Sequence, residues 1–278
     1  MKTIKLLAIT AAMFAVTSCV VEEGGYRQRP TAAGHLIYQN TEGRIKSLTT
    51  IADLAIKLDK YIVADAAERM NLTARFFPNN VPTLSAGAWS FQNAYFTIQP
   101  DSKSLHEVGA KWSITTTGPL FHGISATEPG TFQVECTGTN TWRIIPNGSV
   151  ESSHYNTTPE LSFTGNIPIP ANANPYALYD YTVTGEGRFT PFGFGYRRET
   201  LIIDYQIKNP FVVVVNNISG YYINIFDRMV AKSGKCEMIV TDSEKPAVRD
   251  NVTGEIINAS SSVPSVKITF NGVSEIWN

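Results

Sequence analysis

Residues 201–207 read LIIDYQI, and this stretch shows most clearly the pattern that decides the fold. Apolar side chains stand at every second position from Leu201 to Ile207, with Asp204 and Gln206 between them. A period of two places alternate side chains on opposite faces of a strand. The stretch is therefore typical of a strand with one face on a core and the other in water.

The same alternation recurs through the last two-thirds of the chain, which predicts about ten to twelve strands. Besides residues 201–207, the segments concerned are 89–98, 108–114, 132–136, 142–145, 161–163, 176–183, 211–215, 221–225, 236–240 and 266–270. One-sided strands of this kind are typical of antiparallel sheets. We therefore predict a mainly β protein with an antiparallel β-sandwich over residues 73–278, and a closed β-barrel as the alternative.

A different period precedes the strands. Apolar residues recur every three or four positions from Ile45 to Met70, which predicts a helical segment over residues 41–72. Asn40 or Thr41 can cap its start and Asn71 can end it. One unbroken helix would be about 45 Å long, so a bend or a break into two helices is the alternative to a single rod.

The first 18 residues, MKTIKLLAITAAMFAVTS, predict a signal peptide. Lys2 and Lys5 precede or begin an apolar stretch that ends in small residues just before Cys19. This stretch is shorter than the ~20 apolar residues that a spanning helix needs. Residues 19–40, rich in glycine and interrupted by Pro30, are predicted to be a flexible tether.

Residues 15–18 (AVTS) followed by Cys19 resemble the lipobox of bacterial lipoproteins with a type II signal peptide, although Ala15 or Val16 stands where that family usually has leucine. The resemblance covers about twenty residues and implies cleavage before Cys19 and attachment of lipid, such as palmitate, to its thiol. The acidic pair Glu22 and Glu23 is similar to the surface-export signal of Bacteroidota-type lipoproteins. It implies an outer-membrane anchor with the rest of the protein at the cell surface. The alternative is an ordinary signal peptide followed by a chance cysteine.

The balance of charged residues argues against a nucleic-acid partner. The chain has 23 basic and 24 acidic residues, and removal of residues 1–18 takes away two lysines, which leaves 21 against 24, a net charge of −3. Nucleic-acid binding depends on clustered positive charge, so we predict no nucleic-acid partner. A hydrophobic content of 43% is enough for a large core.

The chain has three cysteines. Lipid on Cys19 would leave Cys136 and Cys236 as the possible intramolecular disulfide in an oxidising envelope. Both lie within alternating apolar patterns, so two unpaired buried thiols are the alternative.

Groups for catalysis are few. The four histidines, His35, His106, His122 and His154, show no metal-ligand spacing, so neither a metal site nor a cofactor is predicted. No nucleophile elbow, phosphate-binding loop or dinucleotide fingerprint occurs in the sequence. An enzyme is therefore not the leading prediction. Several carboxylates near the aromatic region keep a glycan hydrolase as an alternative: Asp180, Glu186, Glu199 and Asp204.

The most unusual segment is RFTPFGFGYRR, residues 188–198. Aromatic faces beside arginines suit a sugar ring or a partner protein. The predicted binding residues are Phe192, Phe194, Tyr196, Arg197 and Arg198, and from Phe189 onward we predict that part of the aromatic cluster is exposed. The alternative is that these rings fill the core.

The leading functional hypothesis is a surface lipoprotein with a non-enzymatic binding or assembly role, whose partner is a glycan or another envelope protein. It rests on the predicted location and on the scarcity of catalytic motifs. A carrier of lipid or of a small apolar ligand inside a closed barrel is one alternative. The glycan hydrolase is the other.

Overall fold

The structure is a computed structural model that describes residues 30–77, 81–91, 96–116, 130–146, 160–165, 179–189, 201–215, 229–242, 244–258 and 264–278. A long helix, α2 (Pro30–Val63), is followed by a shorter one, α3 (Ala66–Phe76). The break between them is marked by Asp65, whose carboxylate caps α3 by accepting a hydrogen bond from the Glu68 amide at 2.9 Å. The segment 41–72 is thus two helices rather than a single rod.

The long helix starts earlier than the sequence predicts. Residues 30–40, predicted as tether, form the first three turns of α2. Gly34 packs against the sheet here, since a Cβ at this position would lie 3.0 Å from Ile268 and 3.2 Å from Phe270. A glycine that reads as a helix breaker in the sequence is therefore a contact residue in the fold. The end of the helical region also differs, because α3 continues past Asn71 to Phe76.

The described strands form one antiparallel sheet of 13 strands, in which every strand pairs with its neighbours in sequence. Their bounds are β1 (Thr83–Ser85), β2 (Ala88–Ser90), β3 (Phe96–Gln99), β4 (Lys111–Thr116), β5 (Gly130–Gly138), β6 (Thr141–Pro146), β7 (Glu160–Gly165), β8 (Tyr179–Phe189), β9 (Leu201–Val215), β10 (Met229–Asp242), β11 (Lys245–Asn258), β12 (Ser265–Phe270) and β13 (Val273–Trp277). The predicted strand at residues 221–225 lies outside the described residues.

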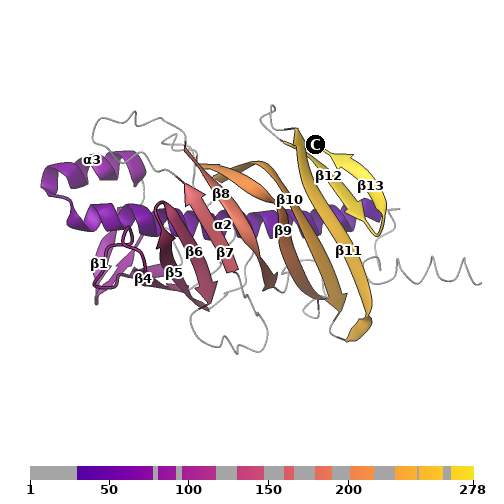
Figure 1. Cartoon of the computed structure of the whole chain (residues 1–278), viewed down its shortest axis with the longest axis horizontal. Helices are drawn as coiled ribbons and strands as arrows, with labels where there is room; N and C mark the ends of the chain where they lie inside the picture. Colours follow the sequence, from indigo (N-terminus) through magenta and orange to yellow (C-terminus); the bar gives the residue numbers. More distant parts are fainter. Residues whose placement is uncertain are drawn as a thin grey trace, which may run out of the picture.

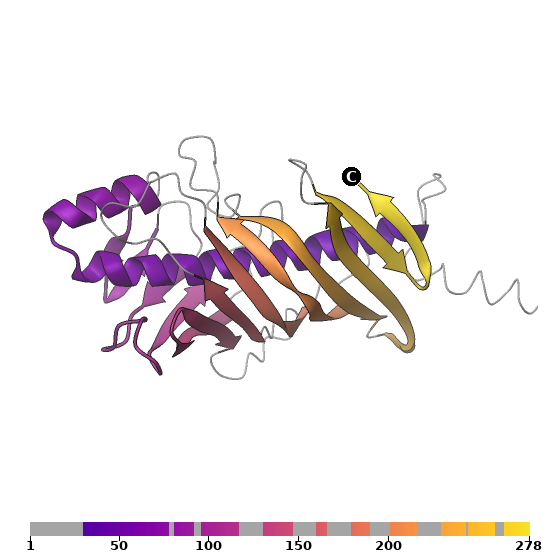
Figure 2. The ribbon, with the colours of Figure 1, turned by 45° about the horizontal axis from the view of Figure 1, so that its top comes forward.

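The strands cross α2 one after another along its length, and the sheet curves around the helix (Figure 1). The turned view shows the same arrangement, with β1 near the carboxyl end of α2 and β13 near its amino end (Figure 2). With 34 residues, α2 is about 50 Å long. The two edges of the sheet are thus separated by roughly the length of the helix.

Glycines in the long strands accompany their irregular pairing. The register between β8 and β9 shifts between Val183 and Glu186, around Gly185 with a φ of 126°. The pairing of β10 with β9 shifts around Gly234, whose φ is 145°, and a Cβ there would lie 2.5 Å from the Phe211 ring. Such bulges bend a strand and increase its twist, which suits a sheet that wraps a helix.

The core lies between the inner face of the sheet and α2. The sheet curves around α2, and the middle of the helix is buried on nearly all sides. Its apolar residues that are no more than 2% exposed are Ile45, Leu48, Ile51, Ala52, Leu54, Ala55, Ile56 and Leu58. The prediction of a mainly β fold with an N-terminal helix and an antiparallel sheet is confirmed. The described sheet is open and sandwich-like, with the helix layered on its inner face, and the closed-barrel alternative is wrong.

Candidate functional site

The residues predicted to bind a partner lie mostly where the structure is not described. Phe192, Phe194, Tyr196, Arg197 and Arg198 fall outside the described residues, as does Cys19. Phe189, at the end of β8, is described and is fully buried. Its ring packs 4.1 Å from the guanidinium carbon of Arg44 and edge-on against Tyr205. Phe189 is thus a core residue whose side chain faces α2, and exposure of the rest of the aromatic cluster stays a prediction.

The possible disulfide between Cys136 and Cys236 is not formed. Cys136 and Cys236 are both free and buried. Cys136 lies on β5 and Cys236 on β10, with four strands between them in the sheet order. Five strand spacings amount to about 24 Å along the sheet, far beyond the ~7 Å between Cα atoms that a disulfide can span. The alternative of two buried thiols describes the structure.

The carboxylates considered for glycan hydrolysis lie on the outer face of the sheet, except Glu199, which is outside the described residues. Asp204 is held by Arg188 on the neighbouring strand, with hydrogen bonds of 2.6 and 3.1 Å. Asp180 and Glu186 are both exposed but stand six positions apart on β8, which is about 20 Å along the strand. Paired hydrolytic carboxylates stand about 5–10 Å apart, so these two do not form such a pair.

The chemically densest part of the described core is a charged cluster between α2 and β8. The Lys57 ammonium lies 2.5 Å from Oδ2 of Asp53, one helical turn away. The hydroxyls of Tyr179 and Tyr181 donate hydrogen bonds of 2.7 and 2.9 Å to the other oxygen, Oδ1. Burial, and next the negative charge of Asp53, raise the pKa of Tyr181 well above its ordinary value. Tyr181 is thus held as a neutral donor.

Aromatic rings complete the surroundings of Lys57. Its ammonium lies 4.9 Å from the centroid of Phe76 and 5.0 Å from that of Tyr179. These contacts add cation–π attraction to the ion pair. These contacts join α2 to β8 and to α3, and so fix the rotation of α2 against the sheet.

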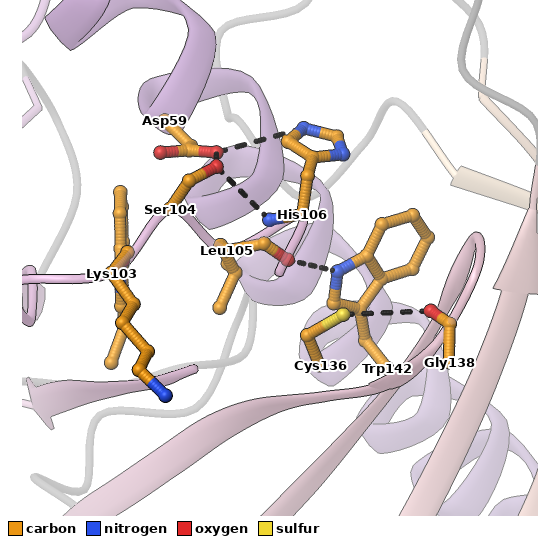
Figure 3. Close-up of polar contacts among 9 residues, drawn as sticks. Asp59, Lys103, Ser104, Leu105, His106, Cys136, Gly138 and Trp142 are labelled. Atoms are coloured by element: carbon orange, nitrogen blue, oxygen red, sulfur yellow. Dashed lines mark hydrogen bonds and ion pairs between the residues drawn. The ribbon is translucent and has the colours of Figure 1, made fainter. Parts of the chain in front are cut away.

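A second polar cluster joins the carboxyl end of α2 to the segment between β3 and β4 (Figure 3). Oγ of Ser104 donates a hydrogen bond of 2.6 Å to Oδ2 of Asp59, and the His106 amide donates to Oγ of Ser104 at 3.2 Å. Nε2 of His106 lies 3.7 Å from the same carboxylate oxygen. Burial, followed by the charge of Lys60, lowers the pKa of His106, while Asp59 raises it.

Two tryptophans fix this segment to the sheet. The indole of Trp142 donates to the carbonyl of Leu105 at 2.8 Å, and its ring meets the His106 ring edge-on (Figure 3). The indole of Trp112 donates to the carbonyl of Lys103 at 3.0 Å. The segment is therefore held by its backbone as well as by its side chains.

Serine, histidine and aspartate meet in this cluster, but not in the order that nucleophilic catalysis requires. A catalytic serine donates its proton to the histidine, which the aspartate orients. Here Ser104 donates to Asp59 directly, and the Sγ of Cys136 is directed to the carbonyl of Gly138 at 3.4 Å (Figure 3). The arrangement therefore has a structural role, because it holds the carboxyl end of α2 to the segment between β3 and β4. No local sequence pattern indicates this cluster, because Asp59 and Ser104 are 45 positions apart.

Neither cluster supplies a metal centre. Across the residues that the structure describes, no three side chains of histidine, cysteine, aspartate or glutamate gather closely enough to hold a metal ion. Of the described helices, none is both long and apolar enough to cross a membrane.

Exposed apolar side chains on the surface are better candidates for a binding site than the two buried clusters. Large exposed apolar side chains gather at the two ends of the described fold. At the end formed by α3 and β1–β4 these are Val63, Met70, Val81, Leu84 and Val108. At the end formed by the start of α2 and β11–β13 they are Leu36, Ile257, Val273 and Ile276. Ile239 on β10 completes the set among the described residues, in which β5–β9 contribute none.

No protein-family model, no curated protein and no solved structure matches this chain.

Proposed function

We propose that the protein is a lipoprotein of the cell envelope, held in the outer membrane by lipid on Cys19 and exposed at the cell surface, with a non-enzymatic binding or assembly role. Support for the anchor comes from the apolar leader and the small residues before Cys19. Support for a non-enzymatic role comes from the two buried polar clusters, because the side chains of Asp53 and Asp59 are engaged in contacts that hold the fold together.

The start of α2 fits an anchor close to one end of the molecule. Cys19 precedes Pro30 by 11 residues, a distance of at most about 40 Å when the chain is fully extended. Since α2 begins beside β13, the lipid would be attached at the β13 end (Figures 1 and 2). The end that carries α3 and β1 would then lie about 50 Å away along the helix.

The observation that carries the assembly role is the position of the exposed apolar side chains. Single exposed apolar residues are common on proteins, but their concentration in one region marks a contact surface. Here they concentrate at both ends of the long axis and are missing from described strands β5–β9 between them. This distribution favours contacts with other proteins through the ends of the molecule.

Glycan binding is a second form of the same role and depends on the segment after β8. Residues 190–198 would supply the rings of Phe192, Phe194 and Tyr196 with Arg197 and Arg198. The carrier alternative required a hollow barrel, whereas the inner face of the described sheet packs on α2. The hydrolase alternative requires two facing carboxylates, but Asp204 is bound by Arg188, and Asp180 and Glu186 stand about 20 Å apart along β8.

The test of the anchor is membrane fractionation of cells that express the whole chain or its Cys19→Ala variant. The unchanged protein should sediment with the outer membrane and be cleaved by protease added to intact cells. The variant should be released or remain unprocessed, because the lipid acceptor is gone. Unchanged membrane retention of Cys19→Ala would contradict the proposal.

The test of glycan binding is a glycan array probed with the protein and with its Phe194→Ala and Tyr196→Ala variants. Exposed rings predict loss of binding with an unchanged melting temperature. Burial of these rings would instead cost about 3 kcal/mol or more of stability per substitution. Loss of stability in both variants would remove this segment as a binding site.

A further inference from the structure

The two apolar ends of the described fold lie at different distances from the residue that would carry the lipid. Cys19 precedes Pro30 by 11 residues, so the lipid lies at most about 40 Å from the start of α2. The helix itself is about 50 Å long. An upright molecule with α3 and β1 against the membrane would lift the start of α2 beyond the reach of these 11 residues. The β13 end, or a flank of the molecule, must therefore face the membrane (Figures 1 and 2).

The β13 end carries exposed apolar side chains on both faces of its last strand. Val273 pairs with the buried Phe270 and so lies on the inner face, where it is 52% exposed. Ile276, three positions further along the strand, lies on the outer face and is 57% exposed. Leu36 on α2 and Ile257 on β11 are exposed at the same end. Apolar side chains on both faces suit an end that enters an apolar layer edge first.

The last strand is held firmly on α2. The Glu275 carboxylate accepts a hydrogen bond from the Thr31 hydroxyl. Trp277 stacks on His35, with the ring centroids 4.4 Å apart. The exposed apolar side chains of β13 therefore keep fixed positions relative to the helix. A preformed surface of this kind needs little further ordering when it meets its partner.

The charges around the β13 end suit lipid head groups, which attract lysine and repel acidic side chains where they are anionic. Within Thr31–Asn40, β12 and β13, all of them described, no exposed side chain is acidic. The exposed Lys267 pairs with Ile276 on the outer face. At the far end, exposed charges of both signs are interspersed among the apolar residues, namely Asp65, Glu68, Arg69, Asp101, Lys103 and Glu107. The β13 end is therefore the better match for a membrane.

We infer that the β13 end rests on the membrane that holds the lipid of Cys19, with Leu36, Val273 and Ile276 among the head groups and α2 standing away from the surface. The inference rests on the anchor proposed above and names the partner of this end as a lipid surface. It leaves the end formed by α3 and β1 about 50 Å from the membrane, where a partner protein can reach it.

A few apolar side chains are enough for this contact. The anchor already holds the protein at the membrane, so the contact forms at a high effective concentration and has only to set the orientation. A molecule lying on the flank of its sheet would need apolar side chains there. The described strands β5–β9 carry no large exposed apolar residue, which favours the upright orientation.

Fluorescence quenching of the whole lipoprotein tests this orientation. The protein is purified from membranes of cells that express the full chain and reconstituted in vesicles of phosphatidylethanolamine and phosphatidylglycerol. Ile276→Cys carries a nitrobenzoxadiazole dye, and a lipid with a nitroxide near its head group quenches the dye on contact. Cys136 and Cys236 are buried and should take up no dye. Emission from position 276 should shift to the blue and be quenched by the nitroxide lipid.

The matched control is Leu84→Cys on β1, because Leu84 is 56% exposed but lies near the opposite end of α2 (Figure 1). A second control is Ile239→Cys on β10, which reports a molecule that lies on its flank. Quenching at position 276 should be at least several-fold greater than at either control position. All three side chains are exposed, so each variant should keep the melting temperature of the wild type.

Equal quenching at positions 84 and 276, stronger quenching at position 239, or a bound protein that shields position 276 from lipid would each overturn the inference. Flotation with the vesicles separates it from the proposed function. A protein that floats without quenching at position 276 keeps its anchor and refutes the contact. Uptake of dye by Cys19 in the wild type would refute the anchor, and quenching at position 276 would then decide whether the contact forms without it.

Discussion

The Lys57 ammonium and the Asp53 carboxylate form an ion pair 2.5 Å long in the protein core, where their side chains are 1% and 4% exposed. The two residues are one helical turn apart on α2. The second carboxylate oxygen of Asp53 accepts hydrogen bonds from the hydroxyls of Tyr179 and Tyr181. A buried pair of this kind offsets its own desolvation only while both charges and their hydrogen bonds are present.

Replacement of one charge should therefore be severe. Asp53→Asn leaves Lys57 charged and buried without its counterion, which should cost about 3–5 kcal/mol in the free energy of unfolding. Urea denaturation measures this loss. The matched control is Asp204→Asn, which breaks the exposed pair with Arg188 and should cost about 1 kcal/mol or less. Equal effects of the two substitutions would contradict the burial of Asp53.

The contact between Gly254 and Tyr38 should make the sheet intolerant of any side chain at position 254. A Cβ on Gly254 of β11 would lie 1.9 Å from Cδ2 of Tyr38, a ring that is almost fully buried on α2. Gly254→Ala should thus destabilise the protein by about 1–3 kcal/mol or more. Gly43→Ala on α2 is the control, because nothing lies within 4 Å of its added Cβ, and alanine there should stabilise by about 0.5–1 kcal/mol. The same sign for both variants would refute this packing.

The free thiols predict a protein whose stability does not depend on reductant. Burial raises the pKa of Cys236 to about 12, and it also raises the pKa of Cys136. Both should therefore resist alkylation at neutral pH in the native protein and react once it is unfolded. The melting temperature should be the same with and without reductant. A disulfide closing this loop of about a hundred residues would contribute about 4–5 kcal/mol, so its presence would show as a clear drop on reduction.

The lowered pKa of His106 predicts a loss of stability toward acid pH. In the unfolded chain histidine titrates near pH ~6.5, so as the pH falls through this value the unfolded state takes up a proton before the folded state does. This contribution is lost from about pH 6.5 down to the lower pKa of the folded state. Urea denaturation of wild type and His106→Gln between pH 8 and pH 5 should show a shallower decline for the variant. His35 also has a lowered pKa but is present in both proteins, so it cancels in the comparison. Parallel curves would contradict the prediction.

Much of the secondary structure follows from local sequence, because the periods of two and 3.6 are properties of a few consecutive residues. The alternation from Leu201 to Ile207 is the inner and outer face of β9, with Leu201, Ile203 and Tyr205 buried. The helical spacing from Ile45 likewise marks the buried middle of α2. The mainly β class with an N-terminal helix could thus be predicted from the sequence alone.

The candidate clusters could be predicted only in part. Asp53 and Lys57 stand at i, i+4, a spacing that most often belongs to an exposed pair on a helix. What makes them core residues is Tyr179 and Tyr181, which stand 126 and 128 positions from Asp53 in the chain. No local pattern reports which strand will cover a given helical face.

The sequence by itself determined the mainly β class with an N-terminal helix and, for strands such as β9, which side is apolar, but it did not predict β11 or β13. Only the tertiary structure decided that residues 30–40 continue the helix, that Cys136 and Cys236 lie apart, and that Leu84 and Val273 are left uncovered at opposite ends. The physical reason is that strand order and the position of α2 arise from pairing and packing between distant segments. Local sequence encodes the faces, whereas the way the sheet curves around the helix determines what each face meets.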